Sequence, residues 1–214
     1  LQLSVDYYDI KVTDYIAAVG GPTLVTQCFQ GVQAACEFVT RDAGGNLTFI
    51  RNISANANEL QVRGFDVELG YRHSFEGVGE FDLRLLGTAY TRLTYVNGGS
   101  ALDGKCQNGV VTQQAYPSMP CYELSARLNY TSGPVQLGGH LRYIPSGKFG
   151  NGYVGPEDDG YATTLPNSIN DNRVADVAYF DLSATVDLID RDDLNFEAFA
   201  FIKNLFDTDP PVAP

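Results

Sequence analysis

The chain has 214 residues and a formal net charge of -12, with 13 Tyr and 12 Phe but no Trp. The acidic balance argues against a nucleic-acid partner, because binding to a phosphate backbone relies on clustered Lys and Arg, and it favours cationic or neutral ligands. No apolar run approaches the ~20 residues of a transmembrane helix, whereas the many Tyr and Phe residues favour β-strands.

Residues 1–12 alternate between apolar and polar side chains, which predicts a half-buried strand. The phase of this alternation slips to Ile10 and Val12 near the end of the segment. We expect a β-bulge near Asp9, because one extra residue moves the following side chains to the other face. The apolar face before the slip holds Leu1, Leu3, Val5 and Tyr7.

A second strand is predicted from Leu60 to Arg72. Leu60 and Val62 are out of phase with the apolar residues that follow, and Gly64 lies at the change. Because Gly in a strand often marks a bulge, we expect one at Gly64. The apolar residues that follow are Phe65, Val67, Leu69 and Tyr71.

Residues 79–95 alternate over a length far greater than the ~5 or 6 residues of an average strand. We expect all of the odd-numbered apolar residues on one face, which meets either a protein core or lipid. These residues are Phe81, Leu83, Leu85, Ala89, Leu93 and Tyr95. The opposite face holds Glu80, Asp82, Arg84, Thr88, Tyr90, Arg92 and Thr94.

Four further alternating strands complete a set of about seven. They are predicted at 122–131, 135–143, 178–188 and 194–203. In two of them, Tyr122 and Tyr130 bracket one apolar face, and His140 belongs to the opposite, polar face. We interpret the charged faces as cross-strand ion pairs, with a solute path as the alternative.

The connections alternate between two lengths. Short connections rich in turn-forming residues occur at 76–79, 132–134 and 190–193, and long polar ones occur at about 13–45, 96–120 and 146–173. Short turns at one end and long loops at the other are typical of an outer-membrane barrel. We therefore predict an all-β fold, an antiparallel transmembrane β-barrel segment with short periplasmic turns and long extracellular loops. The alternative is a secreted or surface β-sandwich that acts as a binding module or adhesin.

The four Cys residues form two local pairs within polar stretches, Cys28 with Cys36 and Cys106 with Cys121. This spacing predicts two loop-closing disulfides and an oxidising compartment. A metal site is the competing interpretation. We expect no metal there, because the spacing is not that of paired zinc ligands and no His lies close by.

No sequence pattern of an enzyme is apparent, and we expect neither catalytic residues nor a cofactor. The adjacent acids Glu157, Asp158 and Asp159 have diverging side chains, unlike the two carboxyls across a glycosidase cleft. The candidate ligand-binding residues are these three acids together with Tyr153 and Tyr161, because loops on a rigid scaffold commonly carry binding. The alternative is an exposed, mobile loop.

Several segments, in this order, resemble the TonB-dependent outer-membrane receptors. They are "LSVDYYDIKVTDYI", "VRGFDVELGYRHSF", "GTAYTRLTY", "RLNYTSGPVQLGGHLRY" and "FIKNLFDTDPP", with a Cys pair in each of two intervening loops. The resemblance implies a barrel of about 22 strands in the bacterial outer membrane, filled by an N-terminal plug domain. It also implies active uptake of a scarce nutrient, such as a metal chelate, cobalamin or a saccharide, with energy from the TonB complex.

The same resemblance implies that residues 1–214 are a partial barrel domain, without the plug domain and the final strand. We expect its partners to be outer-membrane lipid, the rest of the same receptor with its plug, the TonB complex and a small nutrient ligand.

Overall fold

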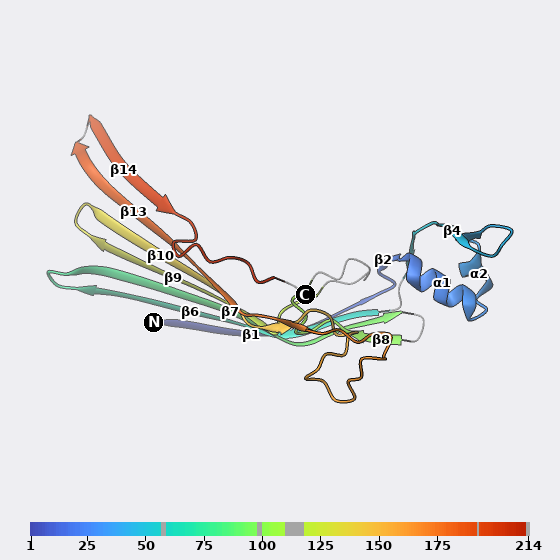
Figure 1. Ribbon diagram of the computed structural model, residues 1–214. Coiled ribbons are helices and arrows are strands. Elements are labelled where there is room, and N and C mark those ends of the chain that lie inside the picture. Colours follow the sequence, from blue (N-terminus) through green and yellow to red (C-terminus); the bar gives the residue numbers. More distant parts are fainter. Residues whose placement is uncertain (57–58, 98–99, 110–117, 192, 213–214) are drawn as a thin grey trace.

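The computed structural model describes residues 1–214 except 57–58, 98–99, 110–117, 192 and 213–214. Seven long strands form one antiparallel sheet in the order β1–β6–β7–β9–β10–β13–β14 (Figure 1). Each long strand therefore lies beside the next long strand along the chain, as predicted. Their bounds are β1 Gln2–Thr13, β6 Glu59–Phe75, β7 Gly79–Asn97, β9 Tyr122–Ser132, β10 Val135–Ile144, β13 Val177–Arg191 and β14 Leu194–Ile202.

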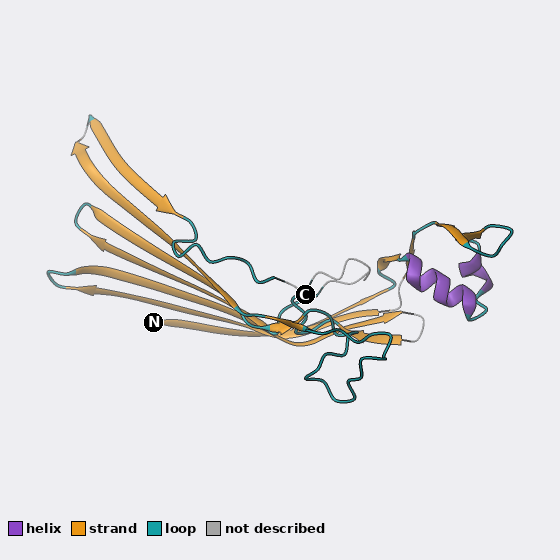
Figure 2. Cartoon of the chain, viewed as in Figure 1, coloured by secondary structure: helices purple, strands orange, loops and turns teal. Residues whose placement is uncertain are grey.

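The connections segregate by length as the sequence predicts. The hairpins β6–β7, β9–β10 and β13–β14 turn at one end of the sheet, and the long connections gather at the other end (Figure 2). Asp192 of the third predicted turn and residues 98–99 and 110–117 of the second long connection lie outside the described residues. A short strand, β8 (Ser100–Asp103), pairs with the far end of β7.

The sheet is open, and one of its faces exposes large apolar side chains. Leu85 is 38% exposed and Leu124 49% exposed on this face, which we call the outer face. The other sheets within the described residues are two-stranded ribbons of the connecting segments. The second sheet that a β-sandwich needs is therefore absent from the described part of the chain, and the apolar face is free to meet lipid.

Two bands of aromatic residues cross the outer face. At the short-turn end, Phe81 lies with its ring centroid 4.7 Å from that of Tyr130 and 5.8 Å from that of Phe75. Near the long connections, the ring centroids of Tyr7 and Phe65 are 5.1 Å apart, and Tyr122 and Tyr143 form a second pair at 6.3 Å. Aromatic girdles of this kind mark the two interfaces of a membrane-spanning barrel.

Beyond the second aromatic band, the polarity of the sheet reverses. The register of β6 with β7 shifts between Arg63 and Gly64, so that Thr91 is an extra residue in β7. Leu93 and Tyr95 therefore lie on the face opposite to Leu85. They are 0% and 1% exposed, respectively. The prediction that all odd-numbered apolar residues of 79–95 share one face is wrong for these two, because the bulge rotates the end of the strand.

The outer face beyond this level carries a polar network instead. Arg63 Nε lies 2.8 Å from Asp9 Oδ2, and Lys11 Nζ lies 2.7 Å from Glu59 Oε2. Arg92 donates a hydrogen bond to Gln61 Oε1 at 3.0 Å. The outer face is thus apolar between the aromatic bands and hydrophilic past them.

Of the two predicted bulges, the one at Gly64 is confirmed as a register shift between Arg63 and Gly64, with its extra residue in β7, and the one near Asp9 is wrong. β1 and β6 pair without a break from Gln2 to Thr13, so no bulge occurs at Asp9, and Gly64 belongs to the regular strand opposite the bulge. In both strands the backbone stays regular, but the apolar residues move to the other face beyond Gly64. They do so because the inner face is the buried one there. A separate bulge falls at Leu188, so that Ile189 takes the place expected for Leu188 on the outer face.

The first long connection folds into a small unit of its own at one end of the molecule (Figure 2). It is carried by the ribbon of β2 (Ile16–Val19) with β5 (Ile53–Asn56) and closed by the predicted disulfide between Cys28 and Cys36. Its core joins Val19, Leu24 and Ala35. Its other elements are α1 Gly21–Phe29, α2 Gln33–Cys36, β3 Val39–Arg41 and β4 Leu47–Ile50. Among the described residues, no helix is both long and apolar enough to cross a membrane.

Candidate functional site

The second and third long connections meet above the buried end of β7. Gly104 donates its backbone N–H to the carbonyl of Leu93, and Tyr90 donates to that of Cys121. The predicted disulfide between Cys106 and Cys121 closes the second long connection. The buried side chains of β7 and the disulfide therefore form a fixed base for the loops.

A short ribbon of the third connection is attached to this base. It consists of β11 (Gly147–Lys148) and β12 (Arg173–Val174). Lys148 donates its backbone N–H to the carbonyl of Cys106 at 2.8 Å and accepts from the N–H of Asn108 at 2.8 Å. Residues 149–172, which the ribbon carries, are thereby held against the disulfide loop.

Two buried polar side chains hold the intervening loop in one conformation. Asn172 accepts a hydrogen bond from Gly150 N and donates one to the carbonyl of Tyr153, at 3.0 and 3.1 Å. Gln107 accepts from Asn151 N at 3.0 Å. Asn172 and Gln107 are 3% and 1% exposed, respectively. Hydrogen bonds from these two buried side chains thus connect residues 150, 151 and 153 to the ribbon and to the disulfide loop.

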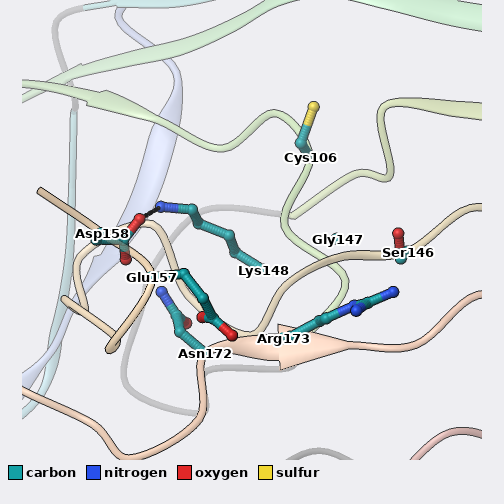
Figure 3. Close-up of a pocket in the computed structure, with 8 residues that line it drawn as sticks. All are labelled: Cys106, Ser146, Gly147, Lys148, Glu157, Asp158, Asn172 and Arg173. Atoms are coloured by element: carbon teal, nitrogen blue, oxygen red, sulfur yellow. Dashed lines mark hydrogen bonds and ion pairs between the residues drawn. The ribbon is translucent and has the colours of Figure 1, made fainter.

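A cavity of about 360 Å³ opens between the ribbon, the loop and the disulfide (Figure 3). Of the five candidate ligand-binding residues, Glu157 and Asp158 line it. Tyr153, Asp159 and Tyr161 do not, and the ring of Tyr153 stacks on Phe149 at 5.8 Å. The complete lining is Cys106, Ser146, Gly147, Lys148, Glu157, Asp158, Asn172 and Arg173.

Of the four charged side chains that line the cavity, two form an ion pair with each other and two do not. Lys148 Nζ and Asp158 Oδ1 are 2.5 Å apart, and Gly155 N donates to the second oxygen of Asp158 at 3.0 Å. The side chains of Glu157 and Arg173 make no ion pair or hydrogen bond with the described residues. The cavity therefore offers one free carboxylate and one free guanidinium to a polar ligand.

The hydrogen bond from Lys148 holds the pKa of Asp158 below its ordinary value of 3.8, and the Gly155 N–H adds to this effect. A lowered pKa means that the charged carboxylate stabilises the loop fully above the ordinary pKa and loses this contribution as pH falls through the lowered one. We expect hydrogen-exchange protection factors of residues 149–172 to fall in this acidic range. Asp158→Asn should abolish the pH dependence, whereas Asp159→Asn should preserve it. An unchanged pH dependence in Asp158→Asn would contradict the assignment.

Removing the Cys106–Cys121 disulfide should loosen the whole cavity. In a chain-entropy model, a loop of this length is stabilised by ~3 kcal/mol, and the backbone of Cys106 also accepts a hydrogen bond from Lys148. We expect the double substitution Cys106→Ser with Cys121→Ser to make residues 96–121 and 146–173 sensitive to trypsin, while the long strands stay resistant. The matching removal of Cys28 and Cys36 should leave both segments resistant.

The inner face of the sheet, opposite to Leu85, carries many charged side chains, and several of them pair across strands. Arg72 Nη2 lies 2.6 Å from Asp82 Oδ2, and Arg84 Nη2 lies 2.8 Å from Glu68 Oε1. Thr88 donates to Asp66 at 2.7 Å. These contacts confirm the interpretation of the charged faces as cross-strand pairing for these residues.

The sequence analysis did not predict that Ser125, His140 and Asp181 lie in contact across three neighbouring strands. His140 Nε2 is 3.0 Å from Ser125 Oγ, and its Nδ1 is 3.5 Å from Asp181 Oδ2. Ser125 lies on β9, which pairs on both sides, so the nearby backbone N–H groups serve the sheet instead of an oxyanion hole. Asp181 also accepts the backbone N–H of Asn204 at 2.9 Å. These contacts give Asp181 the role of anchoring the turn after β14.

A sequence model of the family described as "TonB dependent receptor-like, beta-barrel" matches residues 1–205. The chain belongs to the TonB-dependent receptor β-barrel family. This result confirms the resemblance seen in the ordered sequence segments. The comparison with curated proteins gave no match, and neither did the comparison with solved structures.

TonB-dependent receptors are transport proteins of the bacterial outer membrane, and they are not an enzyme family. Membership implies a plug domain, an interaction with TonB and the binding of a ligand. For this TonB-dependent receptor chain, the aromatic bands and the apolar outer face identify the surface that meets lipid.

Proposed function

We propose that this chain forms part of the wall and rim of a receptor that imports a scarce nutrient with energy from the TonB complex. In this proposal, residues 1–214 are a partial barrel domain whose inner, charged face lines the lumen, and the remaining strands complete a barrel of about 22. An N-terminal plug domain elsewhere in the same receptor fills the lumen and contacts TonB. The observation that best supports a binding function is the rim cavity with its free Glu157 and Arg173.

The ligand enters at the long connections, because they lie beyond the aromatic band where the outer face becomes hydrophilic. Glu157 and Arg173 present opposite charges, so they suit a polar ligand with both donor and acceptor groups, such as a metal chelate, cobalamin or a saccharide. Tyr153, Asp159 and Tyr161 lie outside the cavity lining. In this proposal they contribute to the outer approach, where acidic charge speeds encounter with a cationic ligand.

The test is uptake by cells that carry the full-length receptor. Radiolabelled ferric chelates, cobalamin and a malto-oligosaccharide are offered separately, with and without an uncoupler of the proton gradient. We expect one of them to enter in an energy-dependent way, and Glu157→Gln and Arg173→Gln each to reduce its binding to whole cells about tenfold.

Asp159→Asn is the matched control for binding at equilibrium, because Asp159 is an exposed neighbour outside the cavity lining and in this proposal affects only the rate of encounter. Equal binding by all three variants would remove the cavity from the binding site. Energy-independent entry of every compound would contradict the receptor function itself.

A further inference from the structure

Three positively chargeable side chains stand side by side on the inner face. The strand register places Arg127 of β9 directly opposite Arg84 of β7 on one side and His140 of β10 on the other. Asp181 of β13 follows opposite His140. Like charges directly opposite each other destabilise a sheet, so this row calls for compensating anions.

The two ends of the row have their anions, but its centre does not. Glu68 pairs with Arg84 at 2.8 Å, and Asp181 lies 3.5 Å from His140. Asp82, on the neighbouring row, is held by Arg72. Arg127 makes no ion pair or hydrogen bond with any described residue. It is the uncompensated cation at the centre of the row.

A cavity of about 260 Å³ opens beside Arg127. Asn129 and Ser183 line it as well, and the absence of a side chain at Gly138 leaves room between them. The amide of Asn129, like the guanidinium of Arg127, has no partner among the described residues. Two unused hydrogen-bond donors from one strand therefore project to the same cavity.

We propose that Arg127 and Asn129 bind a carboxylate supplied from outside this chain. Guanidinium and amide N–H groups are complementary to a carboxylate, and such a charge-assisted contact would relieve the repulsion within the row. The cavity is smaller than the 300–1,000 Å³ typical of whole-ligand pockets, so it suits a carboxylate group or a small acid. This proposal rests on the proposed function, which makes the inner face a lumen wall.

The carboxylate has two possible sources, an acidic side chain from the rest of the receptor or a small organic acid in the lumen. The probe is phenylglyoxal, which modifies free guanidinium groups, applied to the purified full-length receptor in detergent with and without sodium succinate. Peptide mass mapping reports the rate at Arg127. Arg84, already held by Glu68, serves as the internal comparison.

For a solute site, we expect succinate to slow modification of Arg127 about tenfold, with no effect at Arg84. For an internal acid, Arg127 is protected without succinate. In that case, Arg127→Gln lowers the urea concentration at which the plug becomes sensitive to trypsin. Gly138→Ala keeps the charge but crowds Ser183 and Asn129, and it should reduce either effect.

Modification of Arg127 at the rate of the free peptide 122–132, unaffected by succinate, would overturn the proposal if Arg127→Gln also leaves plug release unchanged. None of these measurements uses uptake. A receptor that protects Arg127 but shows no energy-dependent import would therefore contradict the proposed function and leave the carboxylate site standing.

Discussion

Leu85→Arg is expected to impair assembly of the barrel. Leu85 lies on the outer face between the two aromatic bands, opposite Ala126 of the next strand. A cation on the lipid face near the middle of the membrane costs ~2–4 kcal/mol. The measurement is the fraction of full-length receptor that folds in outer-membrane vesicles, read from heat-modifiable migration on a gel.

Thr88→Arg is the matched control, because it places the same side chain on the inner face only three residues away. Its hydroxyl contacts the carboxylate of Asp66, which would accept the new cation. We expect assembly close to that of the unsubstituted receptor. Equal losses from the two substitutions would show that the apolar face does not meet lipid.

Leu93→Ala should destabilise the rim by ~2–5 kcal/mol, the range for truncating a fully buried Leu. Leu93 is 0% exposed, and its carbonyl accepts the Gly104 N–H that begins the disulfide loop. The measurement is the urea concentration at which trypsin cleaves residues 146–173. Leu85→Ala should leave this concentration unchanged. If Leu93 faced lipid, as the alternation in the sequence alone predicts, the two variants would behave alike.

The strands and their order were predictable because alternation and turn residues report them directly. The prediction of side-chain orientation failed in β7. Two changes cancel there, one in the direction of the side chains and one in the side of the sheet that is apolar. Thr91 rotates the backbone at the level where the apolar environment changes sides, so the odd-numbered residues stay apolar throughout. In β1 and β6 only the environment changes, and the pattern slips visibly at Ile10 and Val62. Only the register of the paired strands distinguishes the bulge in β7 from the regular backbones of β1 and β6.

The rim cavity was only half predictable. The acids were visible as a charged run, and Glu157 and Asp158 do line the cavity. Lys148 and Arg173 were missed because their ribbon joins two-residue strands far apart in the chain, which leave no periodic signal. The register of β9 with β10 across the turn at 133–134, in contrast, could have been predicted from the sequence. Val135 pairs with Ser132, and counting outward places His140 opposite Arg127.

The disulfide of the small helical unit was predicted, but its helices were not. α1 has only nine residues, and its start carries no side-chain cap. Leu24 is buried against Val19 and Ala35, and the disulfide of Cys28 with Cys36 fixes the two helices together. Tertiary packing thus stabilises helices whose local sequence signal is weak.

The reversal of polarity beyond the aromatic band also affects which parts of the receptor a reagent in water can reach. Lys11, Arg63 and Arg92 stand on strands that continue beyond the aromatic band, with their side chains on the outer face. If the long connections face outward, as the proposed function requires, we expect membrane-impermeant reagents to reach these strands as well as the loops. The three side chains belong to one continuous sheet, so we expect a label attached there to report on the strands and not on the loops.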